Sequence, residues 1–458
     1  MRKVSKELED EAVRHLQALL RLDTTNPPGN EILAARYVKE VLDREGIESR
    51  LLEPFPGRGN VVARLKATLP TLGGIGPGDQ GGALLLTSHM DVVPADKARW
   101  KRDPFSGDQA DGCIWGRGAV DMKSLLALSL AVFCDLKRRK ADLRRDMVLL
   151  AVADEEAGSE KGARWLVAHE PDLVRGEWGL GEVGGFTLHL AGKRAYPVQC
   201  AERGVAWLRL VAEGPPGHGS LPTEDNAVIR LARAVARLEA RALPVHVTEP
   251  ARVFLEELAF FIGGAWGRAL RLLRNPWFSD FLLGQMPPDK RRGLNPLLRN
   301  TVSPTMLQAG SKENVIPSRA TAVLDGRLLP GFNTGDLIAE IRGLLGKDAE
   351  GLRFEVIQEA PANVVPRQTP LFSAIADVVK EHDPGAIAVP YMISGFTDGQ
   401  PLSALGVKHY GFNPVKLPEG LDFAALYHGD DERIPEDGFR WGLSALSDLI
   451  ERFCVVSG

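Results

Sequence analysis

The chain opens with two stretches in which apolar residues recur at helical spacing. Within residues 6–22, one face of a helix would carry Val13, Leu16, Leu19 and Leu20. The turn-forming residues 26–29 follow, and residues 31–45 repeat the same spacing. The pattern therefore predicts two amphipathic helices before the first strand.

Short, continuous apolar runs come next. Residues 83–87 and 147–153 are bounded by turn residues, with a helix-like apolar stretch at 125–133 between them. Strands that are apolar throughout are typical of a sheet covered on both faces. We therefore expect an α/β domain, to which short buried segments at 178–181 and 409–412 and a last helix at 439–453 also belong.

The pattern changes after residue 200. Residues 205–211 and 320–328 alternate apolar and polar positions, as half-exposed strands of an antiparallel sheet do. Between them, residues 251–299 combine aromatic residues with arginines. These are Phe254, Phe260, Phe261, Trp266, Trp277, Phe278 and Phe281 with Arg268, Arg271 and Arg274. The Gly/Pro-rich stretch 70–82 predicts a surface loop.

Composition and charge exclude several classes of function. The 458 residues, 44% of them hydrophobic, are enough for two or three domains, and 56 Lys and Arg nearly balance 60 Asp and Glu. No global basic field predicts a nucleic-acid or acidic-membrane partner. Acidic residues interrupt the first twenty residues, which therefore lack the unbroken apolar segment of a signal peptide. No run in the chain reaches the roughly 18 apolar residues of a membrane span. Four scattered cysteines fit reduced thiols, and we expect a cytoplasmic location.

The segment His89-Met90-Asp91 carries the first chemical signal, because it directly follows the predicted strand at 83–87. Ligands of open α/β sheets bind beyond the carboxyl ends of the strands. His89 could there offer a ring nitrogen to a metal while Asp91 fixes its tautomer. A strand that ends in a polar loop is the plain alternative.

Acidic residues follow at comparable places. Asp121 begins the helix-like stretch and could simply be its cap. Asp154, Glu155 and Glu156 end the second strand, and three adjacent carboxylates repel one another unless cations compensate or water solvates them. Glu182 and His428 are unremarkable when taken singly.

Taken in order, these segments resemble the two-zinc metallopeptidase family that includes aminoacylase, acetylornithine deacetylase, succinyl-diaminopimelate desuccinylase, carboxypeptidase S and bacterial glutamate carboxypeptidase. The resemblance covers nearly the whole chain. Its motifs are HMDVVP, W-KRDPF, GRGAVDMK, ADEEAGSEKGA, GEVGG, GPPGHGS, ENVIP, SGFTDGQ and YHGDDERIP.

The resemblance implies a ligand set and a reaction. His89, Asp121 and Glu182 would hold one zinc ion, Asp121 would bridge, and Glu156 and His428 would hold the second. Cobalt or manganese could replace zinc. The implied reaction is amide hydrolysis by a metal-bound hydroxide, with Glu155 as the general base and Asp91 orienting His89.

The same resemblance implies the domain plan. A zinc-exopeptidase-like catalytic domain, with a mixed central sheet flanked by helices, would comprise residues 1–198 and 362–458. An α+β lid with an antiparallel sheet would be inserted at 199–361 and form a homodimer. In the lid, His218 would reach the scissile carbonyl, while Asn314 and Arg327 would bind substrate; an exposed arginine on a strand and a solvated histidine in a turn are the plain alternatives. Gly395 would line the substrate pocket.

Several points stay open at this stage. The substrate could be an N-acyl amino acid, a dipeptide or carboxypeptidase substrate, or a biosynthetic acyl compound, and a non-catalytic metal-binding scaffold is a remote alternative. No GxGxxG or P-loop fingerprint supports a nucleotide-binding protein. Two positions depart from the family pattern. Val183 separates Glu182 from the glycines at 184 and 185, which directly follow the glutamate in many relatives, and Phe396 stands where the family usually has a small residue, which could narrow the substrate pocket. The aromatics of 251–299 could line a groove for an acyl chain or bury one another, and the Asp121–Met122 peptide is predicted to be cis.

Overall fold

The structure is a computed structural model that describes residues 4–68, 82–286 and 288–456. The chain forms two compact units. Unit 1 comprises Met1–Cys200, Val365–Pro390 and Thr397–Gly458, and unit 2 comprises Ala201–Val364 and Tyr391–Phe396. The loop predicted at 70–82 lies outside the described residues up to position 81.

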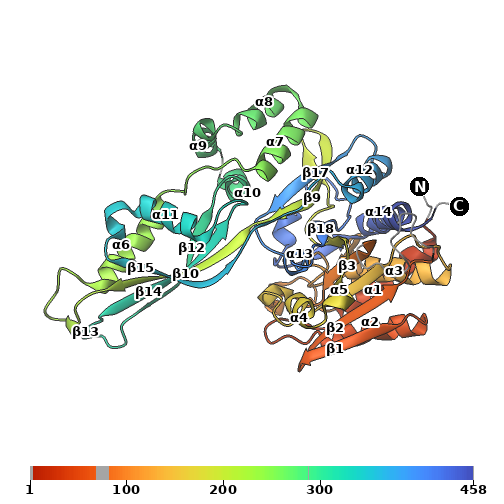
Figure 1. Ribbon diagram of the computed structural model, residues 1–458, viewed down its shortest axis with the longest axis horizontal. Coiled ribbons are helices and arrows are strands. Elements are labelled where there is room, and N and C mark those ends of the chain that lie inside the picture. The colour runs from red at the N-terminus through yellow and green to blue at the C-terminus, as the bar shows by residue number, and fades with distance from the viewer. Residues whose placement is uncertain (1–3, 69–81, 287, 457–458) are drawn as a thin grey trace. The chain divides into compact units, whose positions relative to one another are not determined.

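Unit 1 is built on a mixed sheet whose centre is parallel (Figure 1). The strand order is β1-β2-β6-β3-β7-β18-β9, with β6, β3, β7 and β18 parallel and their outer neighbours antiparallel. The bounds are β1 Ser49–Phe55, β2 Arg58–Leu65, β3 Leu84–His89, β6 Met147–Val152, β7 Trp178–Gly181, β9 Lys193–Glu202 and β18 Lys408–Gly411. Two more strands, β8 Leu188–Leu190 and β17 Ile387–Ile393, pair with β9.

The central strands are apolar throughout because both faces of the sheet are covered. Leu84 and Leu86 of β3 join the larger core, whereas Leu85 joins the core on the other face. The larger core includes residues of α1 Lys6–Leu20, α2 Ile32–Arg44, α3 Lys123–Arg138, α12 Pro370–His382 and α14 Glu436–Cys454. The smaller core includes residues of α4 Ala163–His169, α5 Pro171–Val174 and α13 Gly399–Ser403. The predicted α/β architecture is confirmed.

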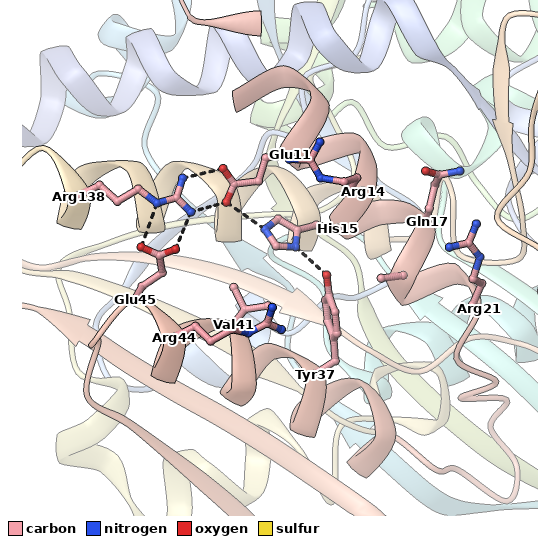
Figure 2. Close-up of a pocket in the computed structure, with 11 residues that line it drawn as sticks. Glu11, Arg14, His15, Gln17, Arg21, Tyr37, Val41, Arg44, Glu45 and Arg138 are labelled. Atoms are coloured by element: carbon pink, nitrogen blue, oxygen red, sulfur yellow. Dashed lines mark hydrogen bonds and ion pairs between the residues drawn. The ribbon is translucent and has the colours of Figure 1, made fainter. Parts of the chain in front are cut away.

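A polar network fixes the helices α1, α2 and α3 to one another beside a groove of about 560 Å³ (Figure 2). The buried His15 ring lies 2.7 Å from the Tyr37 hydroxyl through Nδ1 and 3.4 Å from Glu11 through Nε2. Arg138 donates to both Glu11 and Glu45. Burial opposes ionisation of Glu11, but Arg138 outweighs it and lowers the pKa of this carboxyl to about 2.

Unit 2 contains the separate antiparallel sheet that the alternating pattern predicts. Its order is β12-β14-β10-β15, and helices α6 and α11 bury their apolar faces against it. The bounds are β10 Gly204–Glu213, β12 Thr301–Ala309, β14 Arg319–Leu328, β15 Leu352–Ala360, α6 Ala227–Ala240 and α11 Thr334–Leu345. A two-stranded sheet pairs β11 Gly217–His218 with β13 Val315–Ile316, and β16 Asn363–Val364 pairs with β9.

The aromatic-rich insertion of unit 2 is helical. Its helices are α7 Glu249–Ile262, α8 Gly264–Leu272, α9 Pro276–Gln285 and α10 Pro288–Leu298. Phe254 is buried and its ring lies 5.5 Å from that of Tyr391. However, five other aromatic side chains of the insertion are exposed, namely Phe260, Trp266, Trp277, Phe278 and Phe281. The alternative that the aromatic residues of the insertion bury one another is therefore wrong for these five.

Candidate metal centre

The parallel centre of the sheet brings three sequence-predicted segments to one edge. His89 is the last residue of β3 and pairs in register with Val152, the last residue of β6. Glu155 and Glu156 follow β6 in a 3-10 turn, and Glu182 follows β7. Because parallel strands end at the same edge, these side chains converge beyond it.

A second small sheet brings in the remaining predicted ligands. Strand β19 Arg433–Pro435 pairs with β5 Cys113–Trp115, so the segment after β5 and the segment before β19 run close together. The first segment carries Asp121 and the second carries His428. The Asp121–Met122 peptide is cis, which confirms that prediction. Helix α3 begins at Lys123 without a side-chain cap, so Asp121 is not its cap.

Asp121 lies between two imidazoles and presents a different carboxylate oxygen to each. Its Oδ1 lies 3.0 Å from His89 Nε2, and its Oδ2 lies 3.1 Å from His428 Nε2. His428 Nε2 is also 3.1 Å from Glu156 Oε2. A carboxylate that faces two separate imidazoles in this way has the geometry of a bridging ligand.

Glu155 and Glu182 lie on the His89 side of the cluster. Glu182 Oε2 is 3.5 Å and Glu155 Oε2 is 4.0 Å from His89 Nε2, and both carboxylates are buried. Among the described residues, two groups bring ligand atoms within 4.8 Å of one another: His89 with Asp121 and Glu156, and His89 with Glu155 and Glu182. Geometry alone thus makes Glu155 a possible ligand as well as a free base.

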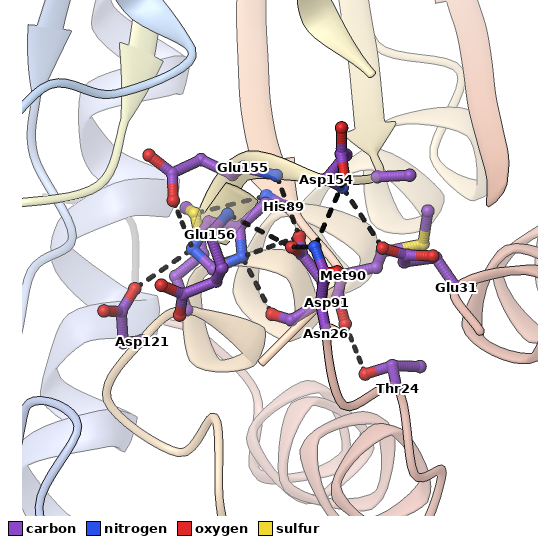
Figure 3. Close-up of polar contacts among 12 residues, drawn as sticks. Thr24, Asn26, Glu31, His89, Met90, Asp91, Asp121, Asp154, Glu155 and Glu156 are labelled. Atoms are coloured by element: carbon purple, nitrogen blue, oxygen red, sulfur yellow. Dashed lines mark hydrogen bonds and ion pairs between the residues drawn. The ribbon is translucent and has the colours of Figure 1, made fainter. Parts of the chain in front are cut away.

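Asp91 holds the two adjacent glutamates through their main chain. Its carboxylate accepts hydrogen bonds from the backbone N–H groups of Glu155 and Glu156, both at 3.1 Å, and from Asn26 at 2.8 Å (Figure 3). His89 Nδ1 lies 2.9 Å from the main-chain carbonyl of Asp91 and 3.5 Å from its carboxylate. The carbonyl is thus the nearer partner of the imidazole, and the carboxylate chiefly fixes the turn that carries the glutamates.

Burial gives the cluster an unusual charge balance. It raises the pKa of Glu155 well above its ordinary value, an effect that the charge of Glu182 reinforces, and it raises the pKa of Glu182 as well. Hydrogen bonds to Asp121 and Glu156 raise the pKa of His428 to about 10. Burial opposes ionisation of Asp121, but bonds from His428 and His89 lower its pKa. Protons therefore offset charge that divalent cations could neutralise instead.

The donor set fits metal ions. Imidazole and carboxylate ligands without thiolates are typical of catalytic rather than structural zinc sites. Glu156 Oε1 is buried and has no hydrogen-bond partner among the described residues, although its other oxygen faces His428. An acceptor left unpaired in this way is costly unless something such as a cation binds it. The residues that could hold two ions are His89, Asp121, Glu156, Glu182 and His428.

Two buried ion pairs near the cluster were not predicted. Glu432 accepts hydrogen bonds from Arg117 and from the backbone N–H groups of Gly118, Val120 and Asp121, at 2.7–3.1 Å. It therefore fixes the loop that presents Asp121. Glu432 belongs to the YHGDDERIP motif. It was not singled out because charged residues in a polar loop are normally exposed to solvent.

The second unpredicted pair lies behind the turn that carries the glutamates. Arg58 donates to both oxygens of Glu31, at 2.7 and 2.5 Å, and to Asp154 Oδ1 at 2.7 Å. Asp154 has a φ of 71°, and its other oxygen accepts from the backbone N–H of Lys161 at 3.0 Å. All three charged side chains are buried, so the alternative of a solvated acidic loop is wrong for Asp154.

Val183, the residue that separates Glu182 from its glycines, has a φ of 59°. This left-handed conformation is rare for a β-branched residue and marks local strain. Gly184 also requires its lack of a side chain, because a Cβ would lie 2.3 Å from the carbonyl oxygen of Gly411. Although Val183 separates Glu182 from its glycines, Glu182 still lies within the cluster, 3.5 Å from His89 Nε2.

Unit 2 contains the other residues singled out in the sequence. His218 on β11 is exposed, and its Nδ1 lies 2.7 Å from the Ser220 hydroxyl. Asn314 immediately precedes β13 and its carbonyl accepts from Gly219 N–H at 2.8 Å, so the structure brings His218 and Asn314 together. Both are surface residues of this small sheet.

Arg327 and Gly395 are the remaining two. Arg327 is only partly exposed and binds Asp325 through Nε at 2.7 Å and Nη2 at 3.1 Å, which leaves its buried Nη1 without a hydrogen bond among the described residues. It is therefore not a freely exposed arginine. At Gly395 no described atom beyond its chain neighbours lies within 4 Å of where a Cβ would sit.

A mixed sheet whose parallel strands end in clustered imidazoles and carboxylates offers the ligands that metal-dependent hydrolases use. The sequence model of peptidase family M20/M25/M40 matches residues 85–452, and the chain belongs to that family. The resemblance inferred from the motifs is thereby confirmed, and the chain is a hydrolase.

Individual relatives agree with this assignment. Aminoacylase-1 of Sus scrofa is 28% identical over 458 residues, covering 98% of this chain and 97% of that protein. An M20 family metallo-carboxypeptidase from Sulfolobus solfataricus has a TM-score of 0.68 at 19% identity, covering 97% of this chain and 99% of its own. A dinuclear metal binding peptidase of the M20 family from Bacillus subtilis has a TM-score of 0.61 at 14% identity, covering 97% and 98%. At these identities the two structures show a shared fold.

Proposed function

We propose that this enzyme hydrolyses the amide bond of N-acyl amino acids. The observation that carries the proposal is the carboxylate of Asp121, whose two oxygens face His89 and His428 at 3.0 and 3.1 Å. That arrangement supports two adjacent metal ions, the basis of this hydrolysis. The full-length similarity to aminoacylase-1 favours an acylated amino acid over a peptide.

We propose zinc as the metal, with cobalt or manganese as substitutes. His89, Asp121 and Glu182 would hold one ion, and Asp121, Glu156 and His428 the other. When bound, such a pair activates water near neutral pH and stabilises the charge that develops on the substrate carbonyl. Two cations held by these ligands would neutralise the buried carboxylates, and this favours the ligand set over a metal-free scaffold.

Glu155 is the proposed general base. Its Oε2 lies 4.0 Å from His89 Nε2, within the cluster, where it can accept a proton from water and then pass it to the leaving amine, a role worth about 10²–10⁴-fold in rate. Asp91 fixes Glu155 and Glu156 through their backbone N–H groups, so that one side chain can bind metal while its neighbour moves the proton. Asp91 thus acts by positioning.

Residues of unit 2 would complete substrate recognition. His218 would stabilise the developing oxyanion of the scissile carbonyl, a role that suits its exposed imidazole. Asn314, beside it, would bind the substrate amide, and the free Nη1 of Arg327 would bind the substrate carboxylate. Gly395 would line the substrate pocket with its main chain. A side chain at this position would extend into the space that the substrate needs.

We also propose a homodimer through unit 2, in the cytoplasm. Strand β12 is the outer strand of its sheet, and its side chains at Met306 and Leu307 are 53% and 61% exposed. A bare strand edge with apolar side chains is a surface that a second copy can extend. None of the four cysteines, all of which lie within the described residues, forms a disulfide, which suits a reducing compartment.

Metal analysis and a substrate panel test this function together. The protein is reconstituted with zinc, its metal content is measured by mass spectrometry, and release of free amino acid is followed from N-acyl amino acids and dipeptides. The Glu155→Gln variant is the matched control, because it keeps the size of the side chain while it removes the base.

Two zinc ions in both proteins, with turnover of N-acyl amino acids only by the wild type, would support the proposal. Wild-type turnover of dipeptides alone would assign a peptidase instead. If neither protein retains zinc, or if Glu155→Gln is as active as the wild type, the two-metal assignment or the base is wrong.

A further inference from the structure

Five aromatic side chains on three successive helices of unit 2 face the solvent. Trp277 is 90% exposed, Phe260 83%, Trp266 68%, Phe281 65% and Phe278 51%. We refer to these five residues as the aromatic patch. Large exposed apolar surfaces on soluble proteins mark interaction sites, since their hydration is unfavourable.

Helix α9 shows most clearly that the patch needs a partner. Its inward positions Ser279 and Leu283 are buried, and its outward positions Trp277, Phe278 and Phe281 are aromatic. A helix that packs against a protein on one side normally presents polar residues on the other. The outer face of α9 instead presents three aromatic rings, so it fits an apolar environment.

The surroundings of the patch are basic. Residues 251–299 contain eight Lys or Arg and four Asp or Glu, a net charge of +4 in a chain whose total is −4. Arg274 pairs with Glu256, and Arg299 pairs with Asp280. Arg268 and Arg271 on α8 are exposed, and neither pairs with an acidic residue in the part of the chain that the structure describes. Unpaired positive charge is therefore exposed on α8, the helix that also carries Trp266.

We propose that the aromatic patch binds the surface of an anionic phospholipid bilayer. Trp and Phe side chains insert at the level of the lipid headgroups, and neighbouring arginines bind the phosphates. Among the described residues, no helix is long and apolar enough to cross a bilayer. The near-neutral total charge hid this feature, because acidic residues elsewhere cancel the local excess.

The same observations disfavour two other occupants. A symmetric contact between two copies would place one basic patch against another, and like charges would oppose it. A bound acyl chain would need rings that enclose it, whereas Trp277 and Phe260 are almost fully exposed. A bilayer satisfies both the apolar rings and the arginines.

Vesicle flotation of the full-length protein tests the proposal. Vesicles of phosphatidylcholine are compared with vesicles that also contain phosphatidylglycerol, and tryptophan fluorescence is recorded in parallel. We expect the protein to float with the anionic vesicles and much less with the neutral ones, accompanied by a blue shift of the fluorescence.

Two double variants separate the two forces. Trp277→Ser with Phe281→Ser should lower the partition coefficient at least about tenfold, because two apolar anchors are lost. Arg268→Glu with Arg271→Glu should remove the preference for anionic vesicles. Phe55→Ser and Arg233→Glu are controls that alter an exposed ring and an exposed arginine elsewhere, and both should bind as the wild type does. Glu155→Gln should also bind normally, since binding does not depend on the reaction.

Three results would overturn the proposal. The first is an absence of flotation with either vesicle, and the second is unchanged flotation of the Trp277/Phe281 variant. The third is a change of that variant from dimer to monomer in light scattering without lipid, which would assign the patch to a second copy of the chain.

Discussion

The metal-ligand cluster of unit 1 and the aromatic patch of unit 2 invert the usual distribution of side chains in opposite ways. In the cluster, carboxylates that normally face water are buried: Asp91 is fully buried and Glu155 and Glu182 are each 7% exposed. In the patch, tryptophan and phenylalanine rings that normally lie inside are exposed. Each inversion is unfavourable for the isolated chain, and the proposed ligands, metal ions for the cluster and lipid for the patch, would offset it.

The two regions differ in how far they are preorganised. Glu432, Asp91 and Arg58 hold the backbone of the cluster by hydrogen bonds, so that the ligand atoms are in place before an ion binds. Within the part of the insertion that the structure describes, no comparable hydrogen-bond framework holds the five rings of the patch. A rigid site suits ligands with fixed coordination geometry, and a loose one suits a fluid lipid surface.

The largest effect is expected from removing the bridging charge in the cluster. Asp121→Asn leaves a side chain of the same size but deletes the charge that both imidazoles face. We expect kcat/KM to fall by at least about 10³-fold, since the proposed metal pair would supply several kcal/mol of transition-state stabilisation. Metal content by mass spectrometry should fall below that of the wild type.

Asp383→Asn provides the control for that change. Asp383 is also a buried carboxylate of unit 1, but it binds Arg194, Tyr196 and Lys416 rather than the cluster. This variant should keep its metal and its activity even if its stability falls. Equal metal loss in both variants would mean that Asp121 acts only through folding.

Much of this preorganised site could be predicted from the sequence. Apolar runs that end in His89, Glu155 or Glu182 predict buried parallel strands, and the topology of such sheets then brings the strand ends together. The inserted antiparallel sheet followed from the alternating pattern, and the mixed central sheet was implied by the family resemblance. The strands and the antiparallel sheet could be predicted because the order of apolar and polar residues within short segments is enough to indicate them.

What could not be predicted depends on burial of charge. Arg58 and Glu31 each look like surface residues in the sequence, and no spacing links positions on β2 and before α2. Glu432 likewise lies in a run of acidic residues. For the patch, composition predicted an aromatic insertion, but a helix that is apolar on all sides gives no indication of which face is exposed.

A smaller effect is expected from loosening the framework of the cluster. Glu432→Ala removes the acceptor for three backbone N–H groups and Arg117, so the Asp121 loop should become less ordered. Zinc affinity measured by calorimetry should fall about 10–100-fold. Glu432→Gln should recover part of the loss, because its carbonyl oxygen can still accept from backbone N–H groups. Wild-type affinity in both variants would contradict a positioning role.

The pH dependence of stability sharpens the comparison further. In the metal-free protein the pKa of Glu155 is raised from an ordinary 4.5, and that of His428 is raised from 6.5 to about 10. At a pH between its ordinary and its folded pKa, each of these two groups is protonated in the folded protein and deprotonated in the unfolded chain. The contribution of each group to the free energy of unfolding is therefore complete below its ordinary pKa and is lost as pH rises through its folded pKa. The gain in Tm on adding zinc should therefore be larger at about pH 8 than at about pH 6, by at least about 3 °C.

The control for this measurement is the Glu155→Gln variant, which lacks one of the groups that titrate. Its metal-free Tm should depend less steeply on pH than that of the wild type. A gain on zinc binding that does not change with pH would show that protons do not offset charge in the cluster.

The smallest effect is expected from the patch, and its smallness is informative. Trp277→Ser removes a ring that is 90% exposed, so the free energy of unfolding in denaturant should change by no more than about 0.5 kcal/mol. Phe254→Ala, in the same insertion, removes a ring that is 7% exposed and should cost about 3–5 kcal/mol. A loss of several kcal/mol at Trp277 would mean that its ring is buried in solution, and the patch would then be part of a core or a subunit interface rather than a lipid-binding surface.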